Sequence, residues 1–227
     1  MVEYRSKTSL AAAAMRDMII AGKVQAGDRF DVRRIAAELG MSITPVREAL
    51  RVLEAEGLVL YNEHRSISAM ELTVEDANEL YLLRSVLESM ATELAATNLI
   101  ETDRRTIEET HEQMVLAVRD EDPARASIAN RNWHFAVYRS ARTKFIEPFI
   151  TRLWSQFAWS TIWNVPGQLE RSVAEHHAIT SALLAHDGAR AAELMREHIG
   201  AGQRAVVDRQ DEAGRAPQPS REAAGRP

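Results

Sequence analysis

The sequence predicts a mostly α-helical protein of two domains. The first is a winged helix-turn-helix with a small β wing, and the second is an antiparallel bundle made only of helices. Between Asp31 and Tyr61, a short helical segment and a glycine turn precede a second helix opened by Ser-x-Thr-Pro-x-Arg. After Met70, apolar residues recur at helical spacing without a strand pattern. The expected divisions are a flexible N-terminus over 1–8, the winged helix over 9–70, the bundle over 71–207 and a disordered tail over 208–227.

The composition supports a folded protein that stays outside membranes. Hydrophobic residues make up 45% of the 227 residues and charged residues 27%, which allows a buried core. The absence of cysteine excludes disulfides and cysteine-ligated zinc and favours a reducing cytoplasm. No apolar run approaches the roughly 18 residues of a membrane span. Residues 1–70 hold ten Lys/Arg against nine Asp/Glu, a net of +1, so the remainder carries −6 of the total charge of −5.

The elements of the first domain follow from caps, breakers and periodicity. Apolar residues at helical spacing predict a first helix from Ser9 to Ala21; they are Leu10, Ala13, Ala14, Met18 and Ile19. A turn follows between Gly22 and Gly27. Asp31 is suited to cap a second helix that ends at Gly40. Ser42 caps a third helix, which tolerates Pro45 in its first turn and stops at Gly57. Two strands, Leu58–Tyr61 and Ser66–Met70, form the wing around a polar tip at 62–65.

The second domain is expected to hold six helices. Thr73 caps the first, in which Leu80, Leu83, Leu87, Met90 and Leu94 form an apolar stripe. Boundary signals at Asp122-Pro123 and Asp187-Gly188 help to place the others. Pro148 is expected to kink or split its helix. The expected spans after the first helix are 101–120, 123–141, 143–163, 166–187 and 189–206.

The third helix has the residue types that a DNA-reading helix needs. Short polar side chains at its N-terminal end meet base edges, and cations meet phosphates. Ser42, Thr44 and Arg47 satisfy the first need, while Arg33 and Arg51 are phosphate candidates. At the wing tip, His64 and Arg65 can reach the minor groove or the backbone. The alternative is structural: Ser42 is only an N-cap, and Arg51 is a solvated charge.

Residues 9–70 resemble the winged-helix domain of the GntR family of bacterial transcription regulators. The similarity rests on five runs of residues: Ile20-x-Gly22, Gly27-Asp28-x-Phe30, Ile35-Ala36-x-x-Leu39-Gly40, Ser42-x-Thr44-Pro45-Val46-Arg47-Glu48-Ala49-Leu50 and Leu53-x-x-Glu56-Gly57-Leu58. The resemblance implies a homodimer on an inverted-repeat operator of double-stranded DNA. It also implies DNA contacts from Arg33, Ser42, Ile43, Thr44, Arg47 and the wing around Arg65. Ile43 stands where many members have arginine, and Ser66 where the wing usually has glycine.

Histidines in the second domain form a candidate metal site. Asn130 and His134 are four residues apart and therefore share one helix face. His176 and His198 lie on the two following long helices, and three imidazoles with one oxygen suit zinc, nickel or another divalent metal. The alternative for each histidine alone is a capping or surface role. Adjacent His176 and His177 are about 100° apart around a helix, so only one can face inward. We expect His111 to be solvated and His186 to interact with a helix dipole.

Residues 73–206 resemble the FCD ligand-binding domain of the FadR subfamily, in its shorter six-helix, VanR-like form. The carrying residues include Glu79-Leu80-Tyr81-x-x-Arg84-x-x-Leu87-Glu88, Asn130-x-x-Trp133-His134, Glu175-His176-x-x-Ile179 and Met195-x-x-His198-Ile199. The resemblance implies a metal held by His134, His176 and His198, with Asn130 in place of the usual acidic ligand. It also implies a small carboxylate effector at that metal.

Arg84 is our candidate for binding the effector's carboxylate, because a buried arginine is costly unless an anion pairs with it. The alternative is a structural ion pair with Glu88, four residues on. We expect Trp154, Trp159 and Trp163 to lie in the core or a pocket wall.

Together these features predict a cytoplasmic, metabolite-responsive transcription repressor that is not an enzyme. Its effector is a small carboxylate or sugar acid, and no organic cofactor is expected. One alternative is a regulator whose metal is purely structural. A less favoured alternative is a helical metal-dependent hydrolase in which three histidines hold a metal that activates water.

Overall fold

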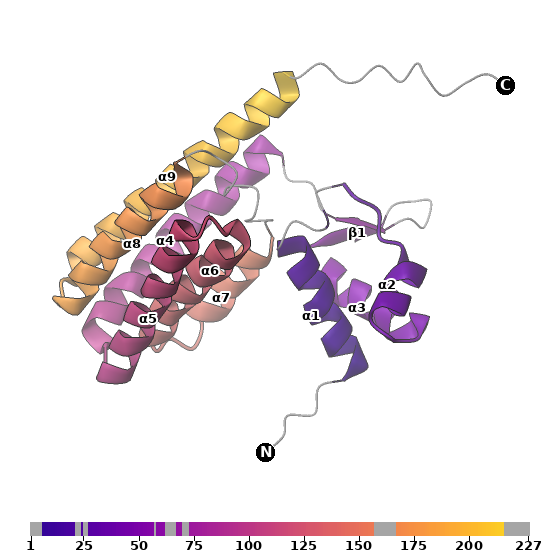
Figure 1. Cartoon of the computed structure of the whole chain (residues 1–227), viewed down its shortest axis with the longest axis horizontal. Coiled ribbons are helices and arrows are strands. Elements are labelled where there is room, and N and C mark those ends of the chain that lie inside the picture. The colour runs from indigo at the N-terminus through magenta and orange to yellow at the C-terminus, as the bar shows by residue number, and fades with distance from the viewer. Residues whose placement is uncertain are drawn as a thin grey trace.

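The computed structural model describes residues 6–20, 24, 27–56, 58–61, 67–69, 73–156 and 167–215. Figure 1 shows two units side by side, a small one at the N-terminal end and a bundle of long helices. The mostly helical fold class is therefore confirmed. The small unit contains α1 (Lys7–Ile20), α2 (Val32–Glu38), α3 (Ile43–Ala55), β1 (Val59–Tyr61) and β2 (Ile67–Ala69). The bundle contains α4 (Val74–Asn98), α5 (Glu101–Arg119), α6 (Pro123–Ser140), α7 (Ile146–Ser155), α8 (Gln168–Leu184) and α9 (Gly188–Arg215).

The N-terminal unit is organised around α3. The side chain of Asp31 accepts hydrogen bonds from the backbone of Arg33 and Arg34 and so caps α2 as predicted. Ser42 occupies the N-cap position of α3, but its side chain makes no capping hydrogen bond. β1 and β2 pair antiparallel, with Leu60 opposite Ser68. The largest fully buried side chains of this unit are Met15, Ile35, Leu50 and Leu53.

The buried face of α1 differs from the set of apolar residues whose spacing predicts the helix. Ala11, Ala12 and Met15 are buried with Ile19, whereas Leu10 is 43% exposed. The run of alanines makes almost every face of this helix apolar, so spacing alone does not choose one. Packing against α3 makes the choice.

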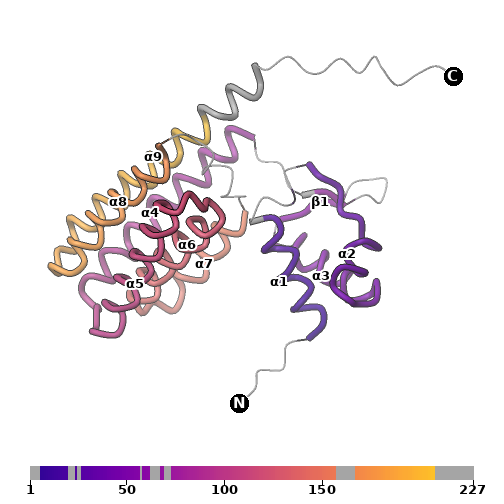
Figure 2. Tube along the Cα trace, viewed as in Figure 1, coloured from indigo at the N-terminus to yellow at the C-terminus, as the bar shows by residue number. Residues whose placement is uncertain are grey.

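In the bundle, α4 packs against α6, α7, α8 and α9. Figure 2 follows the chain through this arrangement, with α8 and α9 along one side of α4 and α5, α6 and α7 along the other. The capping box predicted at Thr73 is present, because the Thr73 hydroxyl accepts from Asp76 N–H and the Asp76 carboxylate accepts from Thr73 N–H. The core contains Tyr81, Trp133 and Tyr138, all fully buried.

The predicted apolar stripe of α4 was partly wrong. Leu80 is buried, but Leu83 is 44% and Met90 46% exposed. The buried face includes Arg84 and Glu88, which pair with each other and so enter the core together. Hydrophobic periodicity cannot anticipate a buried face that contains two charged residues.

Several boundaries also differ from prediction. Pro148 lies in the first turn of α7, where its missing N–H costs no helical hydrogen bond, so it neither kinks nor splits the helix. The chain breaks between α6 and α7, where Arg142 has φ 53°, at the boundary that the predicted spans 123–141 and 143–163 place there. α9 continues to Arg215, past the predicted end of the bundle at 207. α1 begins at Lys7, inside the predicted flexible N-terminus.

Parts of some predicted segments lie outside the described residues. They include 1–5, the glycine turn around Gly22, the wing tip at 62–66, residues 157–163 of the predicted helix 143–163 and 216–227 of the predicted tail. Among the helices of the described part, none is long and apolar enough to span a membrane.

Candidate DNA-reading face and metal centre

The outer face of α3 presents the residues predicted to read DNA. Ser42, Ile43, Thr44 and Arg47 are exposed, while Val46, Ala49, Leu50 and Leu53 anchor the opposite face in the core. The helix is thus held from behind, and its N-terminal end is open to a ligand. Ile43 is 41% exposed, so an apolar side chain stands at the reading end.

Three arginines around this face have no carboxylate counterion in the part of the chain that the structure describes. Arg33 on α2 and Arg47 and Arg51 on α3 are exposed, and none of them forms an ion pair with any residue that the structure describes. Cations left without carboxylate partners suit contacts with phosphate. His64 and Arg65 of the wing tip lie outside the described residues, so their predicted contacts stay predictions.

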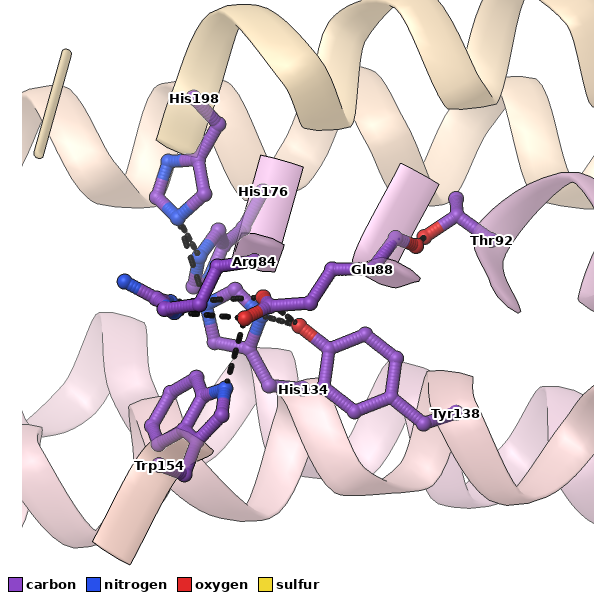
Figure 3. A network of polar contacts seen from close by, with 8 residues as sticks. All are labelled: Arg84, Glu88, Thr92, His134, Tyr138, Trp154, His176 and His198. Carbon is purple, nitrogen blue, oxygen red and sulfur yellow. Dashed lines mark hydrogen bonds and ion pairs between the residues drawn. The ribbon is translucent and has the colours of Figure 1, made fainter. Parts of the chain in front are cut away.

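The second candidate site lies inside the bundle, where α6, α8 and α9 bring three histidines together. The Nε2 atom of His198 lies 3.3 Å from the Nε2 of His134 and 3.3 Å from the Nε2 of His176. The ring atoms of all three that can bind a metal lie within 4.8 Å of one another. Figure 3 shows the three rings converging from separate helices. His134 and His176 are almost fully buried, and His198 is 9% exposed.

Hydrogen bonds at the outer ring nitrogens turn two of these Nε2 atoms into ligand donors. The Nδ1 of His198 lies 2.6 Å from a carboxylate oxygen of Glu175, which can only accept, so Nδ1 carries the proton. The Nδ1 of His134 lies 2.7 Å from the hydroxyl oxygen of Tyr138, whose own proton goes to Glu88. Both Nε2 atoms therefore direct lone pairs into the cluster. Lone pairs that face one another repel unless a cation lies between them, and the donor set fits a divalent metal.

The protonation states of the buried groups agree with this arrangement. Burial lowers the pKa of His134 and His176 well below the ordinary histidine value, and the neighbouring imidazoles lower the two values further. Both rings are therefore neutral near pH 7, as a metal ligand must be. Burial and the nearby Glu88 raise the pKa of Tyr138 well above its usual value, so its hydroxyl stays a donor to Glu88.

Asn130 is the fourth candidate ligand. It lies one turn before His134 on α6 and is 5% exposed. Its Oδ1 atom is buried and has no hydrogen-bond partner among the described residues. A buried amide oxygen without a partner is costly, and a metal bound at the histidines would satisfy it. Three imidazole nitrogens and one amide oxygen are a ligand set that zinc or nickel accepts.

Arg84 forms the ion pair with Glu88 that was the alternative to an effector contact. The Nε of Arg84 lies 2.6 Å from Oε1 of Glu88, and both side chains are buried. Glu88 also accepts hydrogen bonds from Tyr138 and from the indole N–H of Trp154, the latter at 3.0 Å. Figure 3 shows this network reaching His134 through Tyr138. The guanidinium carbon of Arg84 lies 5.0 Å from the ring centres of Tyr81 and Trp154.

Sequence reasoning missed three features of the site: the contact of Tyr138 with His134, the contact of Glu175 with His198, and the hydrogen bonds that Glu88 accepts from Tyr138 and Trp154. Two of them have a local signal that was available. Tyr138 follows His134 by four residues on one helix, and Glu175 adjoins His176. Trp154 is in the core as expected, and Trp159 and Trp163 lie outside the described residues.

The remaining histidines take other roles. His176 is buried and His177 exposed, as their rotation around the helix predicts. The expectation that His111 is solvated was wrong, since it is half-buried with Nε2 3.2 Å from the carbonyl oxygen of Val173. His186 lies 2.8 Å, through Nδ1, from the carbonyl oxygen of Ala96 in the last turn of α4.

Comparisons with known proteins agree with this division. Residues 7–68 match the model of the bacterial regulatory proteins of the gntR family, and residues 79–201 match the FCD domain. The HTH-type transcriptional regulator McbR of Escherichia coli is 28% identical over 193 residues, 82% of this chain and 87% of that protein. The HTH-type transcriptional repressor GlaR of Escherichia coli is 24% identical over 196 residues, 82% of this chain and 89% of that protein.

Solved structures show the same fold. That of Escherichia coli McbR has a TM-score of 0.83 and 24% identity, covering 92% of this chain and 100% of that one. A structure from Rhodococcus sp. RHA1, a transcriptional regulator of the GntR type, has a TM-score of 0.76 and 23% identity. It covers 90% of this chain and 99% of that one. At these identities the likeness concerns the fold alone.

Proposed function

The chain belongs to the GntR family of bacterial transcription regulators and carries an FCD domain, and we propose that it is a repressor whose operator affinity depends on a metal and a small carboxylate in the bundle. Its relatives are regulators of transcription and not enzymes, so the hydrolase hypothesis is dropped. Repression is favoured because similar chains include the repressor GlaR. Such a repressor acts in the cytoplasm, where its operator lies.

The observation that carries the metal proposal is the convergence of three histidine Nε2 atoms in a buried space. Two of these atoms have their lone pairs fixed by hydrogen bonds on the far side of the ring. His134, His176, His198 and the oxygen of Asn130 would hold the metal, which supplies a Lewis-acidic centre with open positions for a carboxylate. Without a metal, burying this set of donors would be unfavourable.

Arg84 contributes to effector binding through its charge in this proposal. Glu88 holds the guanidinium at Nε, and a second nitrogen lies 3.3 Å from the other carboxylate oxygen. The positive charge of Arg84 nevertheless acts on His134 and helps to lower the pKa of that ring. We therefore assign it an indirect role, in which it fixes Glu88 and favours an anion at the metal.

The DNA-reading role belongs to α3 and its neighbours. Ser42, Ile43, Thr44 and Arg47 contact base edges in the major groove, and Arg33 and Arg51 contact phosphates. The wing residues His64 and Arg65 complete the contact with DNA. An inverted-repeat operator requires two copies of this reading face.

A homodimer through α4 would supply the second copy. Leu82, Leu83, Val86 and Met90 are between 44% and 65% exposed and follow helical spacing along one side of α4. An apolar stripe of this length is unfavourable in water unless it is covered. Changing Leu82 and Val86 to glutamate should yield a monomer by light scattering. The same change at Ile128, an isolated exposed residue on α6, should leave the dimer intact.

A path from the metal centre to the reading helix runs through α7. Trp154 donates to Glu88 inside the bundle, and Gln156, at the C-cap of α7, donates to the backbone carbonyl of Glu56. Glu56 is the C-cap of α3 and is paired with Arg16 of α1 at 2.5 Å. A shift of α7 on ligand binding would reach the recognition helix directly.

The metal proposal is tested by thermal unfolding of the purified chain with zinc, with nickel and with a chelator. We expect the chelator to lower the melting temperature of the native chain and to have no effect on His198→Gln, which removes the least buried of the three ligands. A native melting temperature that is the same with and without chelator would overturn the metal proposal.

The same assay with a panel of small carboxylates and sugar acids tests the effector. A compound that raises the melting temperature only when metal is present would identify the effector class. If metal stabilises the chain but no compound adds to it, the metal is structural, and the proposed response to a carboxylate is wrong.

A further inference from the structure

We infer that this chain binds its metal tightly only together with an anion, because every direct ligand in the proposed site is neutral. This inference rests on the proposed metal site and specifies how that site selects its ligand. The anion would complete the coordination sphere, so that metal and effector carboxylate act as one combined signal. Asn130 is the residue that makes the two events interdependent.

The charges around the site support this view. Three imidazoles and one amide bring no negative charge to a divalent cation. Glu88 is buried but is already engaged by Arg84, Tyr138 and Trp154. Glu175 accepts from the Nδ1 of His198 and lies on the outer side of that ring. Neither carboxylate is therefore available as a direct ligand, and the charges of Arg84 and Glu88 cancel each other.

A doubly charged cation in this position would be poorly compensated. The proposed ligands are 0–9% exposed, so little water is available to screen the charge. A buried charge is strongly unfavourable unless an opposite charge pairs with it. A carboxylate at an open coordination position supplies that charge and bonds the metal directly. Because the coupling between two ligands is reciprocal, the anion must tighten the metal as much as the metal tightens the anion.

An aspartate at position 130 would remove the interdependence. It has the shape of asparagine but brings a negative charge to the metal itself. The metal would then bind tightly without an added anion, and an anion would increase the metal affinity by a smaller factor. Asn132 offers a matched control, because it is on the same helix but exposed. Asn132→Asp adds the same charge to α6 outside the site.

The test is a zinc titration of the full chain in competition with a coloured chelator, with and without acetate, in a buffer that does not bind zinc. In the native chain and in Asn132→Asp, acetate should tighten zinc about tenfold, within the range of about 5–150-fold typical of coupled sites. In Asn130→Asp, zinc alone should bind more tightly than to the native chain. Acetate should then change its affinity by less than about twofold.

Two results would overturn the inference while leaving the metal site intact. One is zinc binding to the native chain that acetate does not alter. The other is an acetate effect of equal size in the native chain and in Asn130→Asp. If the native chain binds no zinc under either condition, the proposed function fails as well. If Asn130→Asp does not fold, the acetate effect on the native chain decides the question alone.

Discussion

The two candidate sites of this protein are built in opposite ways. The residues proposed to read DNA are neighbours on α3 and are exposed, with a separate apolar face holding the helix in place. The candidate metal centre is buried and takes its residues from α6, α8 and α9, with a network from α4 and α7 behind them. Function and stability are therefore separable in the first site and joined in the second. Each prediction below tests this difference.

The largest effect on stability should come from Glu88→Ala. Removing this carboxylate breaks the buried ion pair with Arg84 and removes the oxygens that accept hydrogen bonds from Tyr138 and Trp154. Breaking a buried ion pair from one side costs about 3–5 kcal/mol of unfolding free energy. Urea unfolding of the native chain and of the variant, both without metal, measures this loss of unfolding free energy.

A matched control for that variant is Glu108→Ala, which breaks an exposed pair with Arg104 of the same i, i+4 spacing on α5. Surface pairs contribute less than about 1 kcal/mol. Equal losses in the two variants would mean that the Arg84–Glu88 pair is not specially important to the bundle.

The double variant Thr44→Ala with Arg47→Ala should lose operator binding and keep its stability. Each base contact is worth about 1–3 kcal/mol, so the two together should weaken binding by roughly 30-fold or more. The melting temperature should stay that of the native chain, because both side chains are exposed. Glu54→Ala, on the same helix but near its other end, is the control and should bind normally. Intact operator affinity in the double variant would remove α3 from the reading role.

Tyr138→Phe should weaken metal binding without loss of the direct ligands. The change removes the oxygen that accepts the proton of His134 Nδ1, so the ring is no longer held in the ligand tautomer. Loss of such a supporting hydrogen bond typically costs about 10–100-fold in metal affinity. Zinc competition measures the effect, and Tyr61→Phe on β1 is a control that should change nothing. Native-like affinity in Tyr138→Phe would show that packing alone orients His134.

The metal-free chain should lose stability as the pH falls below the ordinary histidine value of 6.5. Burial puts the folded pKa values of His134 and His176 below those of the unfolded chain. Between the two values the unfolded chain binds more protons, so acid favours unfolding by up to about 1.4 kcal/mol per histidine per pH unit.

Urea unfolding at a series of pH values tests this slope. His176→Gln should lose its share of the slope, and His177→Gln, an exposed neighbour, should keep all of it. A slope that is the same in the native chain and in His176→Gln would mean that His176 is not buried as a neutral ring.

The smallest effect should come from Gln156→Ala, which removes a single hydrogen bond between the bundle and the C-cap of α3. Stability should fall by only about 1 kcal/mol. Operator affinity without ligand should change little, but the difference in affinity with and without metal and effector should shrink. A full response in this variant would place the coupling elsewhere.

The sequence predicts the helix that carries the first candidate site well, because the information that defines this helix is local. Ser42, Thr44 and Arg47 are five residues apart or less, and the caps and glycines around them define the helix that carries them. The three histidines were harder to assign, because each alone is an ordinary helical residue. Their places on three helices made them a candidate site, and the resemblance to the FCD domain strengthened that assignment before the structure brought them together.

The remaining features depend on packing between distant segments. Trp154 and Glu88 are 66 residues apart in sequence, and no local sequence pattern around either residue predicts their hydrogen bond. The apolar stripe predicted for α4 was partly wrong because Arg84 and Glu88 lie on the buried face, where hydrophobic periodicity predicts only apolar residues. The alanine run of α1 predicts a helix but not which of its faces is buried, because alanines lie on almost every side of it.

The buried centre is proposed to control the exposed reading face. The most direct test is the affinity of the chain for its operator, selected from random DNA and labelled for fluorescence anisotropy, with zinc and acetate together and with chelator. The native chain should differ between the two conditions by at least about fivefold, and His198→Gln should not differ. An operator affinity that is the same under both conditions in the native chain would contradict the account.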